Sequence, residues 1–159
     1  MQTSFTDKQL LDKDNKSSES ILRKCVHCGM CNATCPTFCV NGEELEGPRG
    51  RIYLIKDMLE NKKPANKKVV KHIDSCLSCY SCMTTCPSGV NYMHLIDHGR
   101  NYVEETYKRP FFDRLFRNVL SFVLPRPKVF LALAYLSKLI KPFSFLLPTF
   151  LKNSLNLMP

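Results

Sequence analysis

The sequence predicts a mainly α-helical protein, with a cysteine-rich domain at residues 20–108 and a helical C-terminal extension at residues 109–159. Three observations predict this. A run of four cysteines occurs twice. Apolar residues recur at the three-to-four spacing of one helix face between and after the runs. Charge and composition change near residue 108. We expect residues 1–19 to be a separate polar N-terminal segment.

The two cysteine runs share the order Cys-x-x-Cys-x-x-Cys-x-x-x-Cys-Pro. The first run has Cys25, Cys28, Cys31 and Cys35, and these recur 51 positions later as Cys76, Cys79, Cys82 and Cys86. This order is typical of bacterial two-cluster ferredoxins, in which the fourth cysteine of each run ligates the other run's cluster. It predicts a bacterial-ferredoxin-like (α-helical ferredoxin) domain that holds two [4Fe-4S] clusters.

The spacing also predicts how the ligands are shared. Three cysteines at i, i+3 and i+6 surround three corners of a cubic cluster, and the fourth thiolate must come from a distant Cys-Pro. The expected ligand sets are Cys25, Cys28, Cys31 and Cys86 for one cluster, and Cys76, Cys79, Cys82 and Cys35 for the other. Zinc is the alternative for Cys-x-x-Cys pairs, but zinc sites usually use two separated pairs and not a repeated triple.

The remaining cysteine and the histidines are not expected to be ligands. Cys39 lies outside both runs and is expected to be a small buried residue. His27 lies within the first run, where a hydrogen-bonding neighbour of the cluster is expected. His72, His94 and His98 are expected to be ordinary surface or core histidines.

Helices are expected around the cysteine runs. They cover residues 6–12, a short segment with Ile21 and Leu22 capped by Ser18 or Ser20, 51–60 with Pro48 in the first turn, 66–74, and 91–107. Residues 41–50 are rich in Gly, Pro and Glu and predict a loop. Pro36 is expected to turn the chain away from the first run. Gly99, on an apolar stripe, predicts close approach to the cluster layer or to a neighbouring helix.

The extension is basic and apolar. Residues 108–159 hold nine of the 23 basic residues and only one of the 14 acidic ones. Residues 111–123 and 129–139 predict two helices that need a core, a partner or a bilayer surface to cover them. Pro125 and Pro127 separate these helices, and Pro142 and Pro148 follow. No uncharged stretch reaches the ~20 residues of a membrane span.

The composition limits which classes of partner and which cellular compartment we expect for the protein. A basic extension suits either an anionic membrane surface or one solvated helix face. Nucleic acid is not expected, because no recognition module is visible. The polar start of the chain lacks the apolar core of a secretory signal, and nine cysteines without such a signal favour a reducing compartment. We therefore expect a cytoplasmic protein, free or peripheral on the inner face of the cytoplasmic membrane.

No catalytic residues are expected. The sequence contains no Gly-x-Gly-x-x-Gly, Walker or nucleophile-elbow motif. Iron–sulfur clusters transfer single electrons, whereas a two-electron substrate oxidation needs a flavin or a nicotinamide. The sequence therefore predicts an electron carrier whose substrate chemistry takes place on another chain.

Four segments carry a resemblance to a known family: ILRKCVHCGMCNATCPTF, GPRGRIYLIK, TTCPSGV and RPFFDRLFRNVLSFVLPRPKVF. Together they resemble the iron–sulfur subunits of glycolate oxidase (glycolate dehydrogenase) over nearly the whole chain. The cysteine runs alone are shared with subunits of succinate and glycerol-3-phosphate dehydrogenases, lactate-utilisation proteins and heterodisulfide reductases. The GPRGRIYLIK segment and the Arg-Pro and Pro-Arg-Pro pairs of the extension favour the glycolate oxidase family.

The resemblance implies a subunit that passes electrons from flavoprotein subunits, which oxidise glycolate and D-lactate, to a quinone or other acceptor at the membrane. Family members are more than twice this long and carry Cys-Cys-Gly motifs that this sequence lacks. This predicts a truncated subunit, or a partner chain that holds the Cys-Cys-Gly domain. The alternatives are the equivalent subunit of a lactate or glycerol-3-phosphate dehydrogenase, and a free-standing ferredoxin-like carrier.

Overall fold

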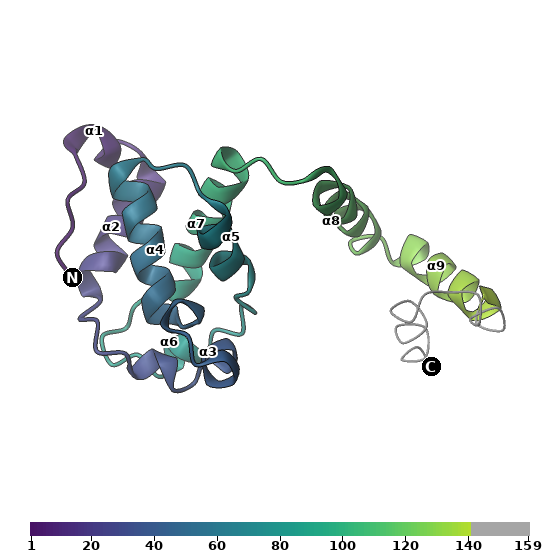
Figure 1. Cartoon of the computed structure of the whole chain (residues 1–159), viewed down its shortest axis with the longest axis horizontal. Coiled ribbons are helices and arrows are strands. Elements are labelled where there is room, and N and C mark those ends of the chain that lie inside the picture. Colours follow the sequence, from purple (N-terminus) through teal and green to yellow (C-terminus); the bar gives the residue numbers. More distant parts are fainter. Residues whose placement is uncertain (141–159) are drawn as a thin grey trace. The chain divides into compact units, whose positions relative to one another are not determined.

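Figure 1 shows the computed structural model, which describes the backbone of residues 1–140 and the side chains of residues 1–135. This part of the chain contains helices and no strand, which confirms the predicted mainly α fold. The chain divides into two compact units, Met1–Lys108 and Arg109–Pro159. The elements of the first unit are α1 (Asp7–Leu10), α2 (Lys13–Lys24), η1 (Met30–Asn32), α3 (Pro36–Asn41), η2 (Glu44–Glu46), α4 (Pro48–Asn61), α5 (Lys67–Asp74), α6 (Ser81–Thr84) and α7 (Tyr92–Thr106).

Helices α2, α4, α5 and α7 pack together around the core of the first unit, and the short elements α3 and α6 lie at one end of them (Figure 1). Six apolar side chains have no exposed surface: Leu22, Ile55, Ile73, Leu95, Ile96 and Val103. They come from all four long helices, so the cysteine-bearing turns are held at the end of a packed bundle.

Helices α4 and α7 approach closely at Gly99. A Cβ atom at this position would lie 2.8 Å from Cγ1 of Ile55, closer than carbon atoms pack. The prediction that Gly99 permits a close approach is confirmed, and the neighbour is α4.

The start of α2 differs from the prediction. The helix begins at Lys13, and its N-cap is Asp12, whose carboxylate accepts a hydrogen bond from the backbone N–H of Asn15 at 3.1 Å. Ser18 is instead buried inside the helix, with its Oγ 2.7 Å from Nδ1 of His98. The predicted cap was wrong because the first two turns of α2 are polar, so the apolar pattern begins well after the helix does.

A short helix, α3, follows the first cysteine run directly, and Pro36 is part of it. Pro36 is the first residue of α3, a position where the missing N–H of proline has no helical partner to lose. The predicted loop at 41–50 contains the 3-10 turn η2, and Pro48 opens α4 as expected. Gly42 ends α3 with φ 68°, a left-handed conformation that glycine adopts at little cost.

The second unit contains α8 (Phe111–Val123) and α9 (Pro127–Ile140), close to the predicted helices. Helix α9 begins two residues before the predicted start because Pro127 occupies its first turn. Pro142 and Pro148 lie outside the described residues. Within the described part of the chain, no helix combines the length and the apolar character needed to cross a bilayer.

Candidate metal centres

The two cysteine runs fold in the same way. Left-handed residues flank the second cysteine of each run: His27 (φ 62°) and Gly29 (83°) flank Cys28, and Ser78 (52°) and Tyr80 (56°) flank Cys79. Left-handed backbone costs a non-glycine residue about 1–3 kcal/mol and is retained mainly where function requires it. Alternating left- and right-handed residues turn successive N–H groups into a concavity of the kind found at many iron–sulfur sites.

The first cavity draws cysteines from both runs. It is lined by Cys25, Cys28, Cys31 and Cys86, and also by Cys82, the third cysteine of the second run. About 440 Å³ in this cavity is free of protein atoms, part of it open to solvent. Cys25 is buried and Cys28 is exposed, so the cavity reaches the surface.

The second cavity is lined by Cys35, Cys76, Cys79 and Cys82, with about 300 Å³ free of protein atoms. The fourth cysteine of each run therefore lies with the first three of the other run. Pro48, Cys82 and Tyr92 line both cavities and form the wall between them.

The thiols of Cys31 and Cys82 are buried close to other thiols of the two runs. Burial, and then the neighbouring Cys25, raise the pKa of Cys31 to about 11, and Cys86 contributes in the same direction. Burial, and then Cys31, raise the pKa of Cys82 to about 12. Thiolates packed this closely need cationic partners, and iron is one. Two groups of four thiols, each lining a cavity, fit two iron–sulfur clusters.

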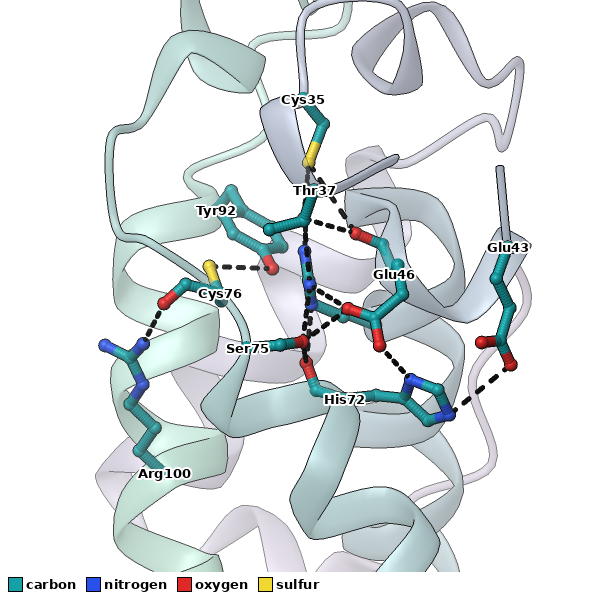
Figure 2. A network of polar contacts seen from close by, with 10 residues as sticks. Cys35, Thr37, Glu43, Glu46, His72, Ser75, Cys76, Tyr92 and Arg100 are labelled. Atoms are coloured by element: carbon teal, nitrogen blue, oxygen red, sulfur yellow. Dashed lines mark hydrogen bonds and ion pairs between the residues drawn. The ribbon is translucent and has the colours of Figure 1, made fainter. Parts of the chain in front are cut away.

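A polar network that the sequence did not predict borders the second cavity (Figure 2). Arg51 is buried and forms an ion pair with Glu46, whose carboxylate is also bonded to the buried His72. Tyr92 donates a hydrogen bond to Sγ of Cys76 at 3.7 Å. Arginine and glutamate usually lie at the surface, so the sequence pattern alone placed Glu46 in a loop and gave no sign of its burial. The sequence feature that could have indicated the burial of Arg51 is the GPRGR segment, in which Arg51 directly precedes the apolar residues of a helix face.

His27 also lines the first cavity, whereas Cys39, His94 and His98 line neither cavity. Cys39 is exposed, so the predicted burial was wrong; it lies on the outer side of α3, with Sγ 3.4 Å from the carbonyl oxygen of Ala33. His27 places Nδ1 3.8 Å from Sγ of Cys25. His94 and His98 are half-buried on α7.

Comparisons with known proteins agree with this geometry. Residues 21–90 match the 4Fe-4S dicluster domain family. The chain is 50% identical over 143 residues, 90% of its length, to the glycolate oxidase iron-sulfur subunit of Escherichia coli, and 32% identical over 117 residues to the probable glycolate oxidase iron-sulfur subunit of Bacillus subtilis. A mitochondrial succinate dehydrogenase iron-sulfur subunit from Candida glabrata is 27% identical over 84 residues. No solved structure matches the chain.

The chain covers only part of each relative: 35% of the Escherichia coli protein and 26% of the Bacillus subtilis protein. The domain match spans both cysteine runs, and the match to the Escherichia coli protein covers most of the chain. Residues 21–90 are therefore a 4Fe-4S dicluster domain, in a chain that is homologous to part of a glycolate oxidase iron–sulfur subunit.

Proposed function

We propose that Cys25, Cys28, Cys31 and Cys86 ligate one [4Fe-4S] cluster and that Cys76, Cys79, Cys82 and Cys35 ligate the other. The observation that supports this assignment is the lining of the two cavities: each combines the first three cysteines of one run with the fourth of the other, and Cys82 lines both. When bound, such clusters accept and pass on single electrons. Pro48, Tyr92 and the proposed ligand Cys82 line both cavities.

We infer further that the chain is the electron-transfer subunit of a glycolate dehydrogenase that also oxidises D-lactate. Flavoprotein subunits supply the electrons, and a quinone or another acceptor at the membrane receives them. The chain has no substrate site of its own in this proposal. The relatives named glycolate oxidase iron-sulfur subunit support it.

The partners proposed are these flavoprotein subunits and a chain that carries the Cys-Cys-Gly domain, at the inner face of the cytoplasmic membrane. Helix α8 supports a docking role. Phe112, Leu115, Phe116 and Val119 are exposed on it at three-to-four spacing. Apolar side chains exposed in such a row are typical of a surface that another molecule covers.

Paired cysteine substitutions test the ligand sets. In the proposed arrangement C35A/C76A removes two ligands of one cluster and spares the other, whereas C25A/C35A damages both. We expect about eight iron and eight sulfide per wild-type chain, about four of each in C35A/C76A, and almost none in C25A/C35A. The reverse pattern for the two double variants would show that each run holds its own cluster. C39A is the control and keeps the wild-type content.

Reconstitution tests the activity. The chain is combined anaerobically with the flavoproteins with which it co-purifies, and reduction of a dye is followed with glycolate, D-lactate or glycerol 3-phosphate as the donor. The proposal predicts glycolate-dependent reduction that is lost in C76S. Activity with glycerol 3-phosphate alone would favour the sister dehydrogenase, and equal reduction by unrelated donors would favour a free-standing carrier.

A further inference from the structure

Two arginine–glutamate pairs flank the cavities and differ in their exposure to water. Arg49 pairs with Glu44 at 2.6 Å beside the first cavity, and Arg51 pairs with Glu46 at 2.9 Å beside the second. The side chains of the first pair are 33% and 45% exposed, and those of the second are 1% and 3% exposed. Water and salt screen the first pair, whereas the charges of the second act at close to full strength.

The guanidinium of Arg51 is fixed in place and faces a proposed ligand. Nη1 lies 3.8 Å from Sγ of Cys35, and Nε donates to the carbonyl oxygen of His72 at 2.7 Å. The remaining nitrogen, Nη2, has three partners: Thr37 Oγ1 at 3.1 Å, Ser75 Oγ at 3.0 Å and Glu46 Oε2 at 2.9 Å. Arg51 therefore presents one N–H edge to the sulfur and is held by its other nitrogens.

Glu46 keeps Arg51 in this position. Its carboxylate forms the ion pair with Nη2 at 2.9 Å and is also hydrogen-bonded to Ser75 and His72. Both partners point at this carboxylate (Figure 2). His72 Nδ1 lies 2.8 Å from Oε1. The carboxylate binds Nη2, while Nη1 faces Cys35, so the positive group is the nearer of the two charges to that sulfur.

A second buried donor serves the same cavity. The hydroxyl group of Tyr92 donates to Sγ of Cys76 at 3.7 Å, and Tyr92 is only 4% exposed. At the first cavity, the corresponding side-chain contact is that of His27, whose Nδ1 lies 3.8 Å from Sγ of Cys25. The second cavity thus combines a buried neutral donor with a buried cation.

We propose that Arg51, assisted by Tyr92, sets the reduction potential of the cluster at Cys35, Cys76, Cys79 and Cys82 above that of the cluster at the first cavity. This inference rests on the ligand sets proposed above. Reduction adds one electron, supplied in the proposed complex by a reduced flavin, and with it one negative charge. A hydrogen bond to a ligand sulfur and a buried cation both stabilise the more negative state. Electrons that enter the domain therefore collect at the second cavity.

Substitutions of the two charges test the proposal in opposite directions. R51Q/E46Q replaces the ion pair by two neutral amides of similar size, and E46Q leaves Arg51 without its carboxylate. Both are made in the full chain with both clusters, and each midpoint is read by EPR during anaerobic titration with dithionite. We expect the midpoint of the second cluster to fall in R51Q/E46Q and to rise in E46Q, each by at least about 59 mV, a tenfold change for a one-electron couple.

Y92F removes only the hydroxyl group and keeps the ring, so it tests the same cluster if the charge variants assemble poorly. It is expected to lower the same midpoint by less than R51Q/E46Q does. R49Q/E44Q is the matched control at the exposed pair and is expected to move neither midpoint by more than a small part of that shift. A loss of protein stability alone would not lower the midpoint of the second cluster in R51Q/E46Q and raise it in E46Q.

The test of the reduction potential can be separated from the test of the cluster ligands. The iron content of C35A/C76A and C25A/C35A decides the ligand sets on its own, and C25A/C86A keeps only the second cluster, so its midpoint can be assigned. If the ligand sets hold but the midpoints of R51Q/E46Q, E46Q and Y92F equal that of the wild type, Arg51 does not set the potential. Equal midpoints for the two clusters in the wild type would also overturn the proposal.

Discussion

Asn32, which follows a cysteine of the first run, caps helix α4 from a distant part of the chain. Its side-chain oxygen accepts a hydrogen bond from the backbone N–H of Arg49 at 3.3 Å, and Asn32 is only 5% exposed. The first N–H groups of a helix have no partner within the helix, so Asn32 supplies what a local cap normally supplies. The first cysteine run and the start of α4 are thereby joined.

Replacing Asn32 by Ala is expected to destabilise the first unit by about 0.5–2 kcal/mol, the usual cost of a lost cap. The midpoint of thermal unfolding, followed by circular dichroism, measures the effect. Amide hydrogen exchange should also quicken at the start of α4. N61A is the control, because Asn61 is exposed at the other end of α4 and bonds only to Asp57. A loss in N61A as large as in N32A would contradict the assigned cap.

Replacing Gly99 by Ala is expected to separate α4 from α7. The new Cβ atom would lie 2.8 Å from Cγ1 of Ile55, a fully buried side chain that has no room to move. Overpacking costs about 1–3 kcal/mol, more than the roughly 1 kcal/mol that alanine gains over glycine in a helix. We expect a lower unfolding midpoint in G99A. The second substitution in G99A/I55V removes Cδ1, which would lie 3.0 Å from the new atom, but keeps Cγ1, so it is expected to restore only a small part of the loss. An unfolding midpoint of G99A equal to that of the wild type would contradict the close approach of α4 and α7.

Replacing Gly50 by Ala is expected to displace η2 from α4. A Cβ atom there would lie 2.3 Å from the backbone oxygen of Glu44, and backbone atoms cannot rotate away. G42A is the matched comparison: a Cβ atom at Gly42 meets nothing within 4 Å, so only its left-handed φ of 68° opposes the change. We expect G50A to lower the unfolding midpoint more than G42A does. The opposite order would mean that the contact with η2 is easily relaxed.

Some features of the first unit could be predicted from the sequence and others could not. The cysteine spacing and the apolar stripes of α4, α5 and α7 follow local rules, so they were predictable. Helix α3 was missed because Pro36 was read as a breaker, although proline is favoured in a first turn. Arg51 and Glu46 were missed for a different reason. A buried ion pair depends on two segments meeting in space, and polar residues carry no mark of burial in a single sequence.

Below neutral pH, His98 should make the first unit acid-sensitive. Burial lowers the pKa of His98 from its ordinary value of 6.5, while the nearby Asp14 and Asp12 oppose this shift. His94 acts in the direction of burial, and Glu105 acts against it. The folded protein thus favours the neutral imidazole, which is bonded to Ser18. The unfolded chain binds the proton more readily, so stability is full above the ordinary pKa and is lost as pH falls through the lowered one.

The H98Q variant tests this dependence. Between about pH 7 and pH 5, the unfolding midpoint of the wild type should fall more steeply than that of H98Q, because only the wild type gains a proton at this position on unfolding. D97N removes an exposed titratable group from the same helix and should keep the wild-type slope. Parallel curves for the wild type and H98Q would remove His98 as the cause.

The exposed apolar row of α8 should matter for association and not for cluster binding. Phe112 and Phe116 are 81% and 64% exposed. We expect F112S/F116S to reduce co-purification with the flavoprotein subunits while the iron content stays at the wild-type level. N118S, a change between polar residues on the same helix, is the control. Undiminished co-purification in F112S/F116S would exclude this row as the contact surface.

The exposed position of Cys39 supplies a constant label, against which the loading of the other eight cysteines can be measured. With the other eight cysteines bound to iron, as proposed, an alkylating reagent can reach one thiol in the folded protein and nine after denaturation. The mass of the labelled chain then counts the thiols that have lost their metal. A single mass spectrum therefore gives the distribution of fully and partly loaded chains in a preparation, before its electron transfer is measured.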